Sequence, residues 1–537
     1  MKRKMALHQL AEPGVIWDIL VIGGGATGLG VAVDAASRGY RTALLEQSDF
    51  AKGTSSRSTK LAHGGVRYLR SGEIGLVRGA LRERGLLERN APHLVHRRAF
   101  VIPIYRRLDL PMYGLGLKAY EWLSGRLSFG ASRILSVAET RRALPTVKDT
   151  NLRGGVLYFD GQFDDARLAL AIARTAESQG AVIANYVRVD QLIKDHGRVV
   201  GAEVIDEETG SRITVRARVV VNATGMFTDA IRRMDDPAVK PMLTVSSGVH
   251  VTLDRSFLPG EHALMIPQTS DGRVLFAVPW QGHVLLGTTD EPRQVPELEP
   301  RPLESEIQFL IEHAAEYLSK PVARKDVLSV FTGLRPLVQQ DNAAATKSLS
   351  RDHVIAVSPG GLVTITGGKW TSYRKMAEDT VDRAAESAGL PPLRSSTVSL
   401  PLYGADVGKP QRFAQYGCDA AELEKLIAAD PTLGQKLHPK LDVLAVEIVW
   451  AARHEMARNV DDALSRRTRA LQLNARAAME AAPQVARLLA LELGHNDSWV
   501  AQQVEQFSTL AQTYLPILQT EVAPAATAPI VAHASQT

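Results

Sequence analysis

The sequence is poor in cysteine and nearly balanced in charge. It has one cysteine, Cys418, in 537 residues, which excludes an internal disulfide and any zinc or iron–sulfur site built from cysteines alone. Its 63 lysines and arginines face 58 acidic residues, so the net charge is only +5. This charge permits an anionic partner without requiring one. No basic stripe with interleaved aromatic residues is present, so we expect no nucleic-acid partner.

Long apolar runs are also missing. The longest apolar stretch, from Val15 to Ala36, contains Asp18, Asp34 and several glycines, so it is not a membrane-spanning helix. The first ten residues, MKRKMALHQL, are basic, but no apolar segment of signal-peptide length follows them. We therefore expect a protein that folds in the cytoplasm and that meets a membrane only peripherally.

The composition is that of a globular protein with several structural parts. Hydrophobic residues make up 45% and charged residues 23%, which excludes a disordered or collagen-like chain. At about 150 residues per domain, the length predicts three or four domains, or two large ones. Apolar spacing predicts helices at 76–90 and 165–178 among strands. Residues 241–290 indicate an antiparallel sheet, and from about residue 395 the sequence becomes helical.

A glycine-rich turn near the N-terminus predicts a dinucleotide site. Gly23, Gly25 and Gly28 form the pattern G-x-G-x-x-G between a strand at 17–22 and a helix. The first glycine permits the tight turn, the second lets the backbone approach a pyrophosphate, and the third allows close packing of helix on strand. The helix N-terminus then offers free N–H groups to phosphate. Glu46 follows the second strand, where its carboxylate can bind ribose hydroxyls.

Two further motifs favour FAD over NAD as that dinucleotide. Residues 222–225, with the sequence NATG, end a strand far downstream of the first glycine turn. Gly367 and Gly368 stand at a strand-to-helix junction. There the backbone could face a flavin, and the helix N-terminus could stabilise negative charge. A simple NAD domain needs neither motif, so the sequence indicates a flavoprotein.

Several segments match the motifs of one known family, in the family's order. They are IGGGATGLGVAVDAASRG (22–39), GTSSRSTKLAHGGVRYL (53–69), GLRPL (333–337), LSRDHVI (349–355), GGKWTSYRKMA (367–377) and EMARNVDDALSRRTR (455–469). By these segments the chain resembles the FAD-dependent, respiratory-type glycerol-3-phosphate dehydrogenases over residues 17 to about 470. It departs from them where Leu29 replaces a smaller residue, and where Ser247 and Val249 replace the lysine and serine of some members. His250 is retained.

The resemblance implies the fold of the D-amino-acid oxidases. This fold is α/β, with a Rossmann-like FAD-binding domain, an antiparallel-sheet substrate domain and, here, a helical C-terminal domain. The expected parts are a discontinuous FAD-binding domain over 16–69, 150–240 and 340–390, a substrate domain over 70–149 and 241–339, and a helical domain over 395–518. We also expect a loose basic lead-in at 1–15 and a disordered tail at 519–537.

The resemblance also implies an activity and its partners. The enzyme would oxidise glycerol 3-phosphate to dihydroxyacetone phosphate by hydride transfer to FAD, and pass the electrons to a membrane quinone. A quinone acceptor implies peripheral attachment to the cytoplasmic face of the inner membrane, with contact to acidic lipid. A homodimer is left open. Cys418 lies far in sequence from every flavin motif, so we expect FAD to be bound non-covalently.

The chemistry of this reaction selects the candidate site residues. A dianionic phosphate needs cations, for which we expect Arg335 and Lys369. The hydroxyl proton needs a base of near-neutral pKa, for which the family's site positions offer His63 and His250, with Arg335 as an aid; which histidine takes the proton is left open. The expected substrate-binding residues are Arg67, Tyr68, His250, Arg335 and Lys369, and the expected cofactor-binding residues are Gly23, Gly25, Gly28, Glu46, Thr54, Ser55, Ser58, Ala223, Gly225, Gly367, Gly368 and Lys369.

Other interpretations stay open beside this one. An amine or amino-acid oxidase of the same fold would need a carboxylate-binding arginine but no phosphate site. A flavin-binding module without turnover would bind the cofactor and reduce nothing. Arg466, Arg467 and Arg469 are interpreted as a solvated helix face, with contact to acidic lipid or to a partner domain as the alternative, and His353 is interpreted as structural.

Overall fold

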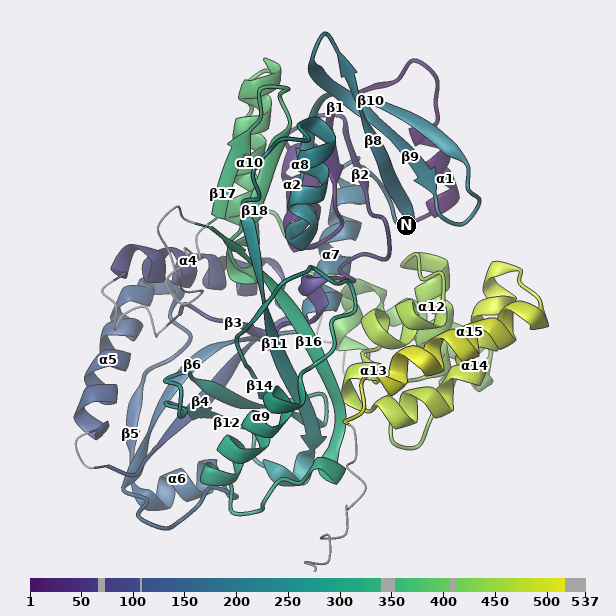
Figure 1. Cartoon of the computed structure of the whole chain (residues 1–537). Helices are drawn as coiled ribbons and strands as arrows, with labels where there is room; N and C mark the ends of the chain where they lie inside the picture. The colour runs from purple at the N-terminus through teal and green to yellow at the C-terminus, as the bar shows by residue number, and fades with distance from the viewer. Residues whose placement is uncertain (66–72, 107–108, 340–352, 406–411, 517–537) are drawn as a thin grey trace, which may run out of the picture.

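Two β-sheets and a group of C-terminal helices make up the molecule (Figure 1). The computed structural model describes residues 1–65, 73–106, 109–339, 353–405 and 412–516. In Figure 1 the first sheet lies above, the second sheet lies below it, and the C-terminal helices lie beside the second sheet and below the first. The parts are thus arranged around a common junction.

The first sheet is built on parallel strands. Among the described residues it has eight strands, in the order β17-β18-β10-β1-β2-β7, with β9 paired to β10 and β8 to β9. Their bounds are β1 (Ile16–Ile22), β2 (Thr42–Leu45), β7 (Val182–Ala184), β8 (Val187–Asp195), β9 (Arg198–Asp206), β10 (Arg212–Asn222), β17 (His353–Val357) and β18 (Val363–Gly367). Helix α2 (Ala26–Ser37) contacts both α7 (Asp165–Ser178) and α10 (Tyr373–Ala388). These helices bury apolar faces in one core with β1 and β2.

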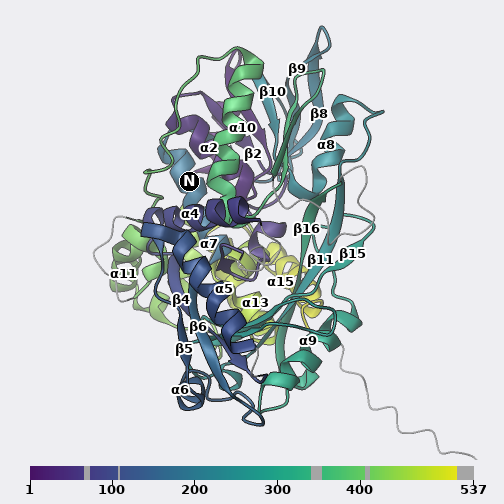
Figure 2. The same cartoon turned by 90° about the vertical axis from the view of Figure 1, so that its left-hand side faces the viewer.

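The second sheet is mostly antiparallel. Its order is β15-β11-β14-β13-β12-β4-β6-β3, with β16 paired to β11 and β5 to β6. The bounds are β3 (Leu61–Ala62), β4 (Val95–Ile104), β5 (Arg133–Leu135), β6 (Gly154–Phe163), β11 (Leu243–Asp254), β12 (Ala263–Ile266), β13 (Leu275–Trp280), β14 (His283–Gly287), β15 (Glu291–Arg293) and β16 (Val327–Val338). The accompanying helices are α4 (Ile74–Asn90), α5 (Asp109–Ser124), α6 (Val137–Ala143) and α9 (Glu304–Tyr317), whereas α8 (Thr228–Asp235) packs on β8, β10 and β18 of the first sheet. In Figure 2, α5 lies over β4 and β6 on the side turned toward the viewer.

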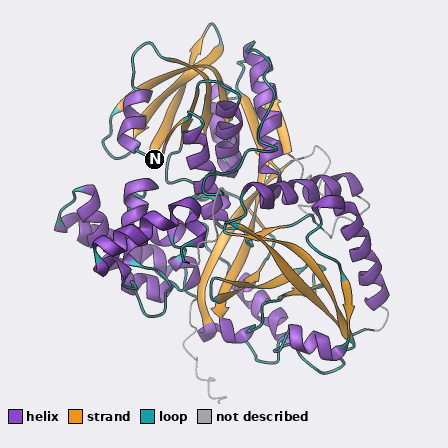
Figure 3. Ribbon diagram, turned by 180° about the vertical axis from the view of Figure 1, so that it is seen from behind, coloured by secondary structure: helices purple, strands orange, loops and turns teal. Residues whose placement is uncertain are grey.

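The C-terminal region is helical and packs on the second sheet. It contains α11 (Ala420–Ala429), α12 (Ala445–His454), a π-helical turn (Asp462–Arg467), α13 (Ala470–Leu473), α14 (Ala475–Leu493) and α15 (Asp497–Gln512). Small alanines on α14 are buried in a core that also takes Trp280, Leu285 and Phe331 from the second sheet. Figure 3 shows these helices grouped beside the sheets. No helix in the described ranges is long and apolar enough to cross a membrane.

Residues 1–15 are not loose, and that expectation is wrong. Helix α1 (Arg3–Leu10) packs its buried Ala6 and Leu10 into a core with the first sheet. The Arg3 guanidinium is also buried, where it donates 2.9 Å to the backbone oxygen of Asn185 and pairs with Asp206. The basic charge of this segment hides its apolar row, which is why the sequence predicted no structure there.

Two strands differ from the domain boundaries expected from the sequence. Strands β3 and β6 fall in segments assigned to the FAD-binding domain, yet both pair within the second sheet. A strand's own pattern shows that it is buried but does not show which sheet it joins. The expected tail at 519–537 lies outside the described residues.

One buried ion pair joins α10, which packs on the first sheet, to α4, and it gives a stability prediction. Arg374 of α10 donates two bonds of 2.8 Å to the carboxylate of Glu83 on α4, and both side chains are buried. Glu83→Gln leaves a buried cation without its full counter-charge, so we expect the free energy of unfolding to fall by about 3 kcal/mol. The measurement is a shift in the denaturant midpoint. Glu386→Gln, which breaks the exposed pair with Arg383, should change it far less. Equal shifts in the two variants would contradict this prediction.

Candidate active site

An elongated cavity lies along the carboxyl ends of the first sheet. It has about 1590 Å³ of empty space and is open to solvent. Its walls come from the β1–α2 turn, the end of β2, the loop at 51–55, strand β8, the segment after β10 and the β18–α10 junction. The expected cofactor residues that line it are Gly23, Gly25, Glu46, Thr54, Ser55, Ala223, Gly225, Gly367, Gly368 and Lys369.

The glycine turn is shaped by close backbone approaches. Gly23 has a φ of +112°, and a Cβ there would lie 2.6 Å from the carbonyl oxygen of Ala223. A Cβ at Gly28 would lie 1.9 Å from the carbonyl oxygen of Gly23, so this glycine shapes the turn from behind without lining the cavity. Gly25 is the N-cap of α2, and the next N–H, that of Ala26, donates 2.9 Å to the hydroxyl of Ser55. The N-terminus of α2 therefore faces the cavity with its positive dipole end.

Glu46 marks one end of the cavity. Its half-buried carboxylate accepts a 2.6 Å bond from the N–H of Gly24 and a 2.8 Å bond from that of Ser48. Burial raises the pKa of this carboxyl, and the two N–H donors oppose that shift. The carboxylate is thus held at the end of β2, in the position from which a ribose hydroxyl can be bound.

Lys369 lies near the other end, where the second glycine pair turns the chain. Gly367 and Gly368 have φ values of +77° and +73°, a conformation that favours glycine. Lys369 follows as the N-cap of a short 3-10 turn (Trp370–Ser372) that leads into α10. The indole Nε1 of Trp370 donates 2.9 Å to the carbonyl oxygen of Ser55. This bond ties the flavin end of the cavity to the loop that lines its centre.

His250 is buried on the second sheet. Its Nε2 lies 2.8 Å from the hydroxyl of Thr59, and its ring stacks on Phe331 with centroids 5.0 Å apart. A Cβ at Gly287 would lie 2.2 Å from the ring, so glycine at this position makes room for it. Burial, with Lys60 and Arg335 nearby, holds the pKa of His250 well below its usual value of 6.5. The imidazole is therefore neutral and able to accept a proton.

Lys60 is a fully buried cation beside this histidine. Its ammonium donates to both carboxylate oxygens of Asp165, at 2.9 and 2.7 Å, and to the carbonyl oxygen of Ser56 at 2.8 Å. Burial and the positive charge of Arg469 lower the pKa of Lys60 to about 7, whereas Asp165 opposes this shift. The ammonium also lies 5.1 Å from the centre of the Phe331 ring, on which His250 stacks.

Arg335 lies on β16, next to the strand that carries His250. Its guanidinium donates to the backbone oxygens of Ser247 and Thr289, at 3.0 and 2.9 Å, and to the hydroxyl of Thr288 at 3.1 Å. It also lies 3.4 Å from the carboxylate of Asp290. These bonds fix the direction of the guanidinium, while its side chain keeps 29% of its surface exposed.

The remaining predicted residues have other positions. His63 follows β3 and is half-buried, and the hydroxyl of Ser58 donates 2.7 Å to Asp165. Arg67 and Tyr68 lie outside the described residues. In the described part of the chain, His63, His250, Arg335 and Ser58 are not among the residues that line the cavity. They come from the adjoining second sheet and from the loop that leads into it.

The three basic residues interpreted as a solvated helix face are instead buried. Arg466, Arg467 and Arg469 keep 2%, 1% and 1% of their surface exposed, which overturns both the solvated-face and the acidic-lipid interpretation. They pair with Asp49 and Asp165 of the same chain. Burial could not be anticipated because the acidic partners lie hundreds of residues away in sequence.

Sequence reasoning also missed residues that contact the site. Thr59 and Trp370 stand inside the quoted motifs but were not singled out. Thr59 precedes His63 by four residues and Trp370 follows Lys369 directly, and this closeness to predicted site residues could have identified them. Lys60 also stands inside a quoted motif, but Asp165 stands in none, and a buried ion pair leaves no mark in either local pattern. The strand β8, which adds Val187 to the cavity wall, likewise carries no motif.

The cavity fits FAD in three observed respects. A carboxylate stands at one end, a glycine turn and an open helix N-terminus stand in the middle, and a second glycine pair with Lys369 stands at the other end. These groups suit a ribose, a pyrophosphate and the pyrimidine side of a flavin, in that order. The exposed Cys418 is not part of the described cavity wall.

Comparisons with known proteins agree with this assignment. The model of the family "FAD dependent oxidoreductase" matches residues 18–374, and that of the "C-terminal domain of alpha-glycerophosphate oxidase" matches residues 364–500. A probable mitochondrial glycerol-3-phosphate dehydrogenase of Caenorhabditis elegans is 42% identical, over 94% of this chain and 74% of that protein. The mitochondrial glycerol-3-phosphate dehydrogenase of Homo sapiens is 41% identical, over 91% of this chain and 72% of that protein.

Solved structures point the same way. The glycerol-3-phosphate dehydrogenase from Bacillus halodurans, complexed with FAD, is 30% identical with a TM-score of 0.76, over 97% of this chain and 99% of that chain. The L-alpha-glycerophosphate oxidase from Mycoplasma pneumoniae, with a TM-score of 0.57 at 16% identity, covers 74% of this chain and 99% of that chain and shows the fold alone. The fold class expected from the sequence is confirmed. The chain belongs to the FAD-dependent oxidoreductases and, within them, to the family of glycerol-3-phosphate dehydrogenases.

Proposed function

We propose that this chain is a FAD-dependent dehydrogenase that oxidises glycerol 3-phosphate to dihydroxyacetone phosphate. The observation that carries the proposal is the single cavity that runs from Glu46 past the N-terminus of α2 to Lys369. Membership of the glycerol-3-phosphate dehydrogenase family supports the choice of substrate. An amino-acid oxidase of the same fold is the alternative, and the phosphate cations distinguish the two.

The residues of the cavity have distinct tasks in this reaction. Bound FAD supplies the hydride acceptor. Glu46 holds the ribose, the N–H groups at the start of α2 hold the pyrophosphate, and Gly367 and Gly368 let the backbone face the flavin ring. A cysteinyl bond to the flavin is excluded because the single cysteine stands apart from the cavity, and we expect the attachment to be non-covalent.

Substrate binding and proton removal use the second sheet. Lys369 and Arg335 hold the dianionic phosphate, with Arg67 and Tyr68 of the HGGVRY motif as further contacts. His250 accepts the hydroxyl proton as the hydride leaves carbon 2. Its environment keeps the imidazole neutral before this step, and the lowered pKa also makes it a weaker base than a free histidine. His63 is the second candidate for this role.

Electron transfer to a membrane quinone requires a surface that meets lipid, and α5 offers one. Met112, Leu115, Ala119 and Trp122 are exposed at spacings of 3, 4 and 3 residues, which places them on one helix face. Leu115 and Trp122 keep 74% and 81% of their surface exposed. Contact of these apolar side chains with water is unfavourable, and burial at a lipid interface would remove that contact. Exposed Lys118 and Arg133 add charge suited to acidic lipid.

This face supports peripheral attachment to a membrane, with the quinone reached through the lipid. The cytoplasmic side of the inner membrane is our prediction for its location. A homodimer remains a prediction, to be checked by the mass of the detergent-purified enzyme. These finer features of the proposal stand apart from the dehydrogenase activity itself, because an artificial electron acceptor can replace the quinone in the assay.

The proton acceptor gives the first functional prediction. His250→Gln should keep normal flavin content and lose about 10²- to 10⁴-fold in kcat. Because the pKa of His250 lies well below 6.5, the acid limb of the kcat/KM profile should lie below pH 6.5 in the unmutated enzyme and vanish in the variant. His283→Gln, at the half-buried first residue of β14, is the matched control. An unchanged pH profile in His250→Gln would transfer the role to His63.

Phosphate recognition gives the second functional prediction. A charge-assisted contact contributes roughly 1.5–3 kcal/mol, so Arg335→Ala and Lys369→Ala should each lower kcat/KM for glycerol 3-phosphate by about 10- to 150-fold. Arg335→Lys should also be costly, because an ammonium cannot form paired hydrogen bonds. Flavin content is measured alongside, and Lys375→Ala on the exposed side of α10 serves as the control. Unmutated efficiency in both variants, or flavin bleaching by amino acids instead, would favour the oxidase alternative.

Membrane attachment gives the third functional prediction. Leu115→Glu and Trp122→Glu place a charge on the apolar face of α5, so binding to vesicles of phosphatidylcholine and phosphatidylglycerol should weaken. Quinone reduction should fall with it, while turnover with a soluble acceptor stays unchanged. Leu491→Glu, on an equally exposed leucine of α14, should bind vesicles normally. Normal binding by both α5 variants would place the membrane surface elsewhere.

A further inference from the structure

A loop without long regular structure forms one wall of the flavin cavity. We define the cavity loop as residues 47–60, which follow Glu46 and contain only a short 3-10 turn (Thr54–Ser56). It lines the cavity through Gln47 and residues 51–55, with Thr54 and Ser55 among them. A loop that must present such contacts in a fixed position needs support from its outer side.

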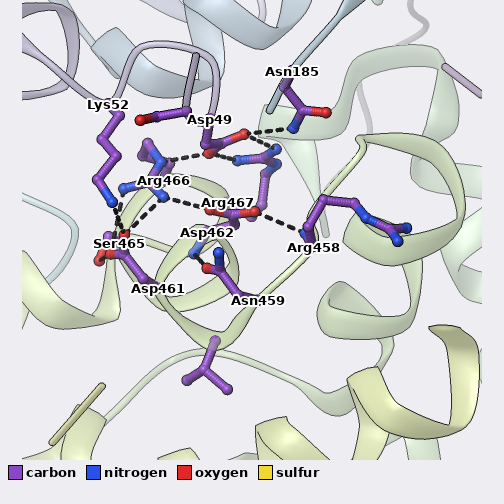
Figure 4. A network of polar contacts seen from close by, with 12 residues as sticks. Asp49, Lys52, Asn185, Arg458, Asn459, Asp461, Asp462, Ser465, Arg466 and Arg467 are labelled. Atoms are coloured by element: carbon purple, nitrogen blue, oxygen red, sulfur yellow. Dashed lines mark hydrogen bonds and ion pairs between the residues drawn. The ribbon is translucent and has the colours of Figure 1, made fainter. Parts of the chain in front are cut away.

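The first support is Asp49, which is fully buried and faces two arginines of the C-terminal region (Figure 4). Arg467 forms a forked contact with it, through bonds of 2.5 and 2.7 Å to the two carboxylate oxygens. The Nε of Arg466 donates a further 2.5 Å bond to Asp49, and Asn185 contacts it at 3.3 Å. Figure 4 shows Arg466 and Arg467 reaching Asp49 from the helical region, while Asn185 reaches it from the segment after β7.

The second support is the carbonyl oxygen of Ser56, the residue after Ser55. It accepts bonds from Arg469 at 2.8 Å, from Gln472 at 2.9 Å and from Lys60 at 2.8 Å. Arg469 and Gln472 belong to the same C-terminal segment as Arg467. A single backbone oxygen with three donors has little freedom to move.

Two further ion pairs hold the loop at other points. Lys52 pairs with Asp461 at 3.0 Å, and Arg57 pairs with Glu299 at 2.6 Å. Tyr514 donates 3.2 Å to the same carboxylate of Glu299. Thus the C-terminal region contacts the loop directly at Asp49, Lys52 and Ser56. It contacts Glu299, the partner of Arg57, through Tyr514. None of the C-terminal residues involved lines the described cavity.

The arrangement is geometrically strict because it is buried and charged. Arg466 also pairs with Asp461 at 3.1 Å and with Asp462 at 2.7 Å, so each cation of the cluster has a carboxylate partner. Removing these charges from water costs free energy, and the ion pairs offset that cost only while they are intact. A loop displaced from this position would leave buried charges unpaired, which makes other loop positions unfavourable.

We propose that the C-terminal segment 461–472 positions the cavity loop for FAD, so that the helical region controls how tightly the cofactor is held. Asp49, Arg467 and Arg469 are positioning residues in this view, since they act on FAD through Thr54 and Ser55. The inference rests on the proposed FAD site. It gives the helical region a role in cofactor retention, although none of the region's described residues lines the cavity.

The first experiment measures FAD release from the holoenzyme after dilution, by the rise in flavin fluorescence. Arg467→Lys keeps the charge but loses the forked contact with Asp49. We expect its dissociation constant for FAD to rise about tenfold, which equals about 1.4 kcal/mol. Gln472→Leu, a milder change that removes one donor to Ser56, should act in the same direction. With FAD at saturation, both variants should recover the unmutated kcat.

The control is an ion pair that joins the same two regions away from the loop. Arg174 of α7 pairs with Asp419 near the start of α11, and Arg174→Lys should leave the FAD dissociation constant unchanged. Melting temperatures are recorded for all variants with and without excess FAD. A role in stability alone would lower the melting temperature in Arg467→Lys and Arg174→Lys with no change in FAD affinity, and this outcome would overturn the proposal.

The second experiment uses the reciprocity of coupled equilibria. If segment 461–472 positions the cavity loop, then bound FAD must stabilise that segment in return. Backbone hydrogen exchange at 461–472 should therefore slow when FAD is present, although these residues do not line the cavity. Slowing confined to the cavity wall would contradict the inference.

The proposed FAD site is tested separately within the same series. A Cβ at Gly25 would lie 3.2 Å from the hydroxyl of Ser55 and would meet the pyrophosphate, so Gly25→Val should lack flavin. Full yellow absorbance in Gly25→Val would reject the FAD site itself. Loss of flavin in Gly25→Val, together with unchanged affinity in Arg467→Lys and Gln472→Leu, would reject only the positioning role.

Discussion

One buried carboxylate, that of Asp165, holds the two sheets and the helical region together. It stands at the start of α7 and is fully buried. It accepts bonds from the backbone and hydroxyl of Ser58, from Lys60 and from Arg469. A buried carboxylate is tolerated only when its charge is matched, so these segments must arrive together. The cavity loop, the buried Lys60 beside His250 and the docking of the C-terminal segment all meet at this group.

The fold was predictable wherever local pattern determines structure. The glycine turn, the helix at 165–178 and the helical C-terminal region all follow from spacing and composition. The sheet joined by β3 and β6 did not follow, because strand pairing is decided by distant partners. The helix at Arg3–Leu10 was missed for a related reason: its Arg3 is basic in sequence but finds acidic partners two hundred residues away.

The site divides in the same manner. The roles of the glycines were predictable from the sequence, because a tight turn requires a residue without a side chain. Gly23 and Gly367 do adopt conformations that favour glycine. Lys60 and Thr59, in contrast, acquire their significance only from the burial of His250 beside them. Arg466, Arg467 and Arg469 show the limit most clearly. A run of arginines is normally solvated, and only the acids at Asp49 and Asp165 explain why this one is not.

The contact between Asp49 and Arg467 spans 418 residues of sequence, and this span sets an order of events during synthesis. Ribosomes add about 5–20 residues per second, so Asp49 waits on the order of 20–80 s for its partner to be made. Through that interval the glycine turn and its helix can fold, but the wall beside them lacks its support. The nascent enzyme should therefore acquire tight cofactor binding only near the end of translation, and a chain that terminates early would leave the ribosome with its flavin site unfinished.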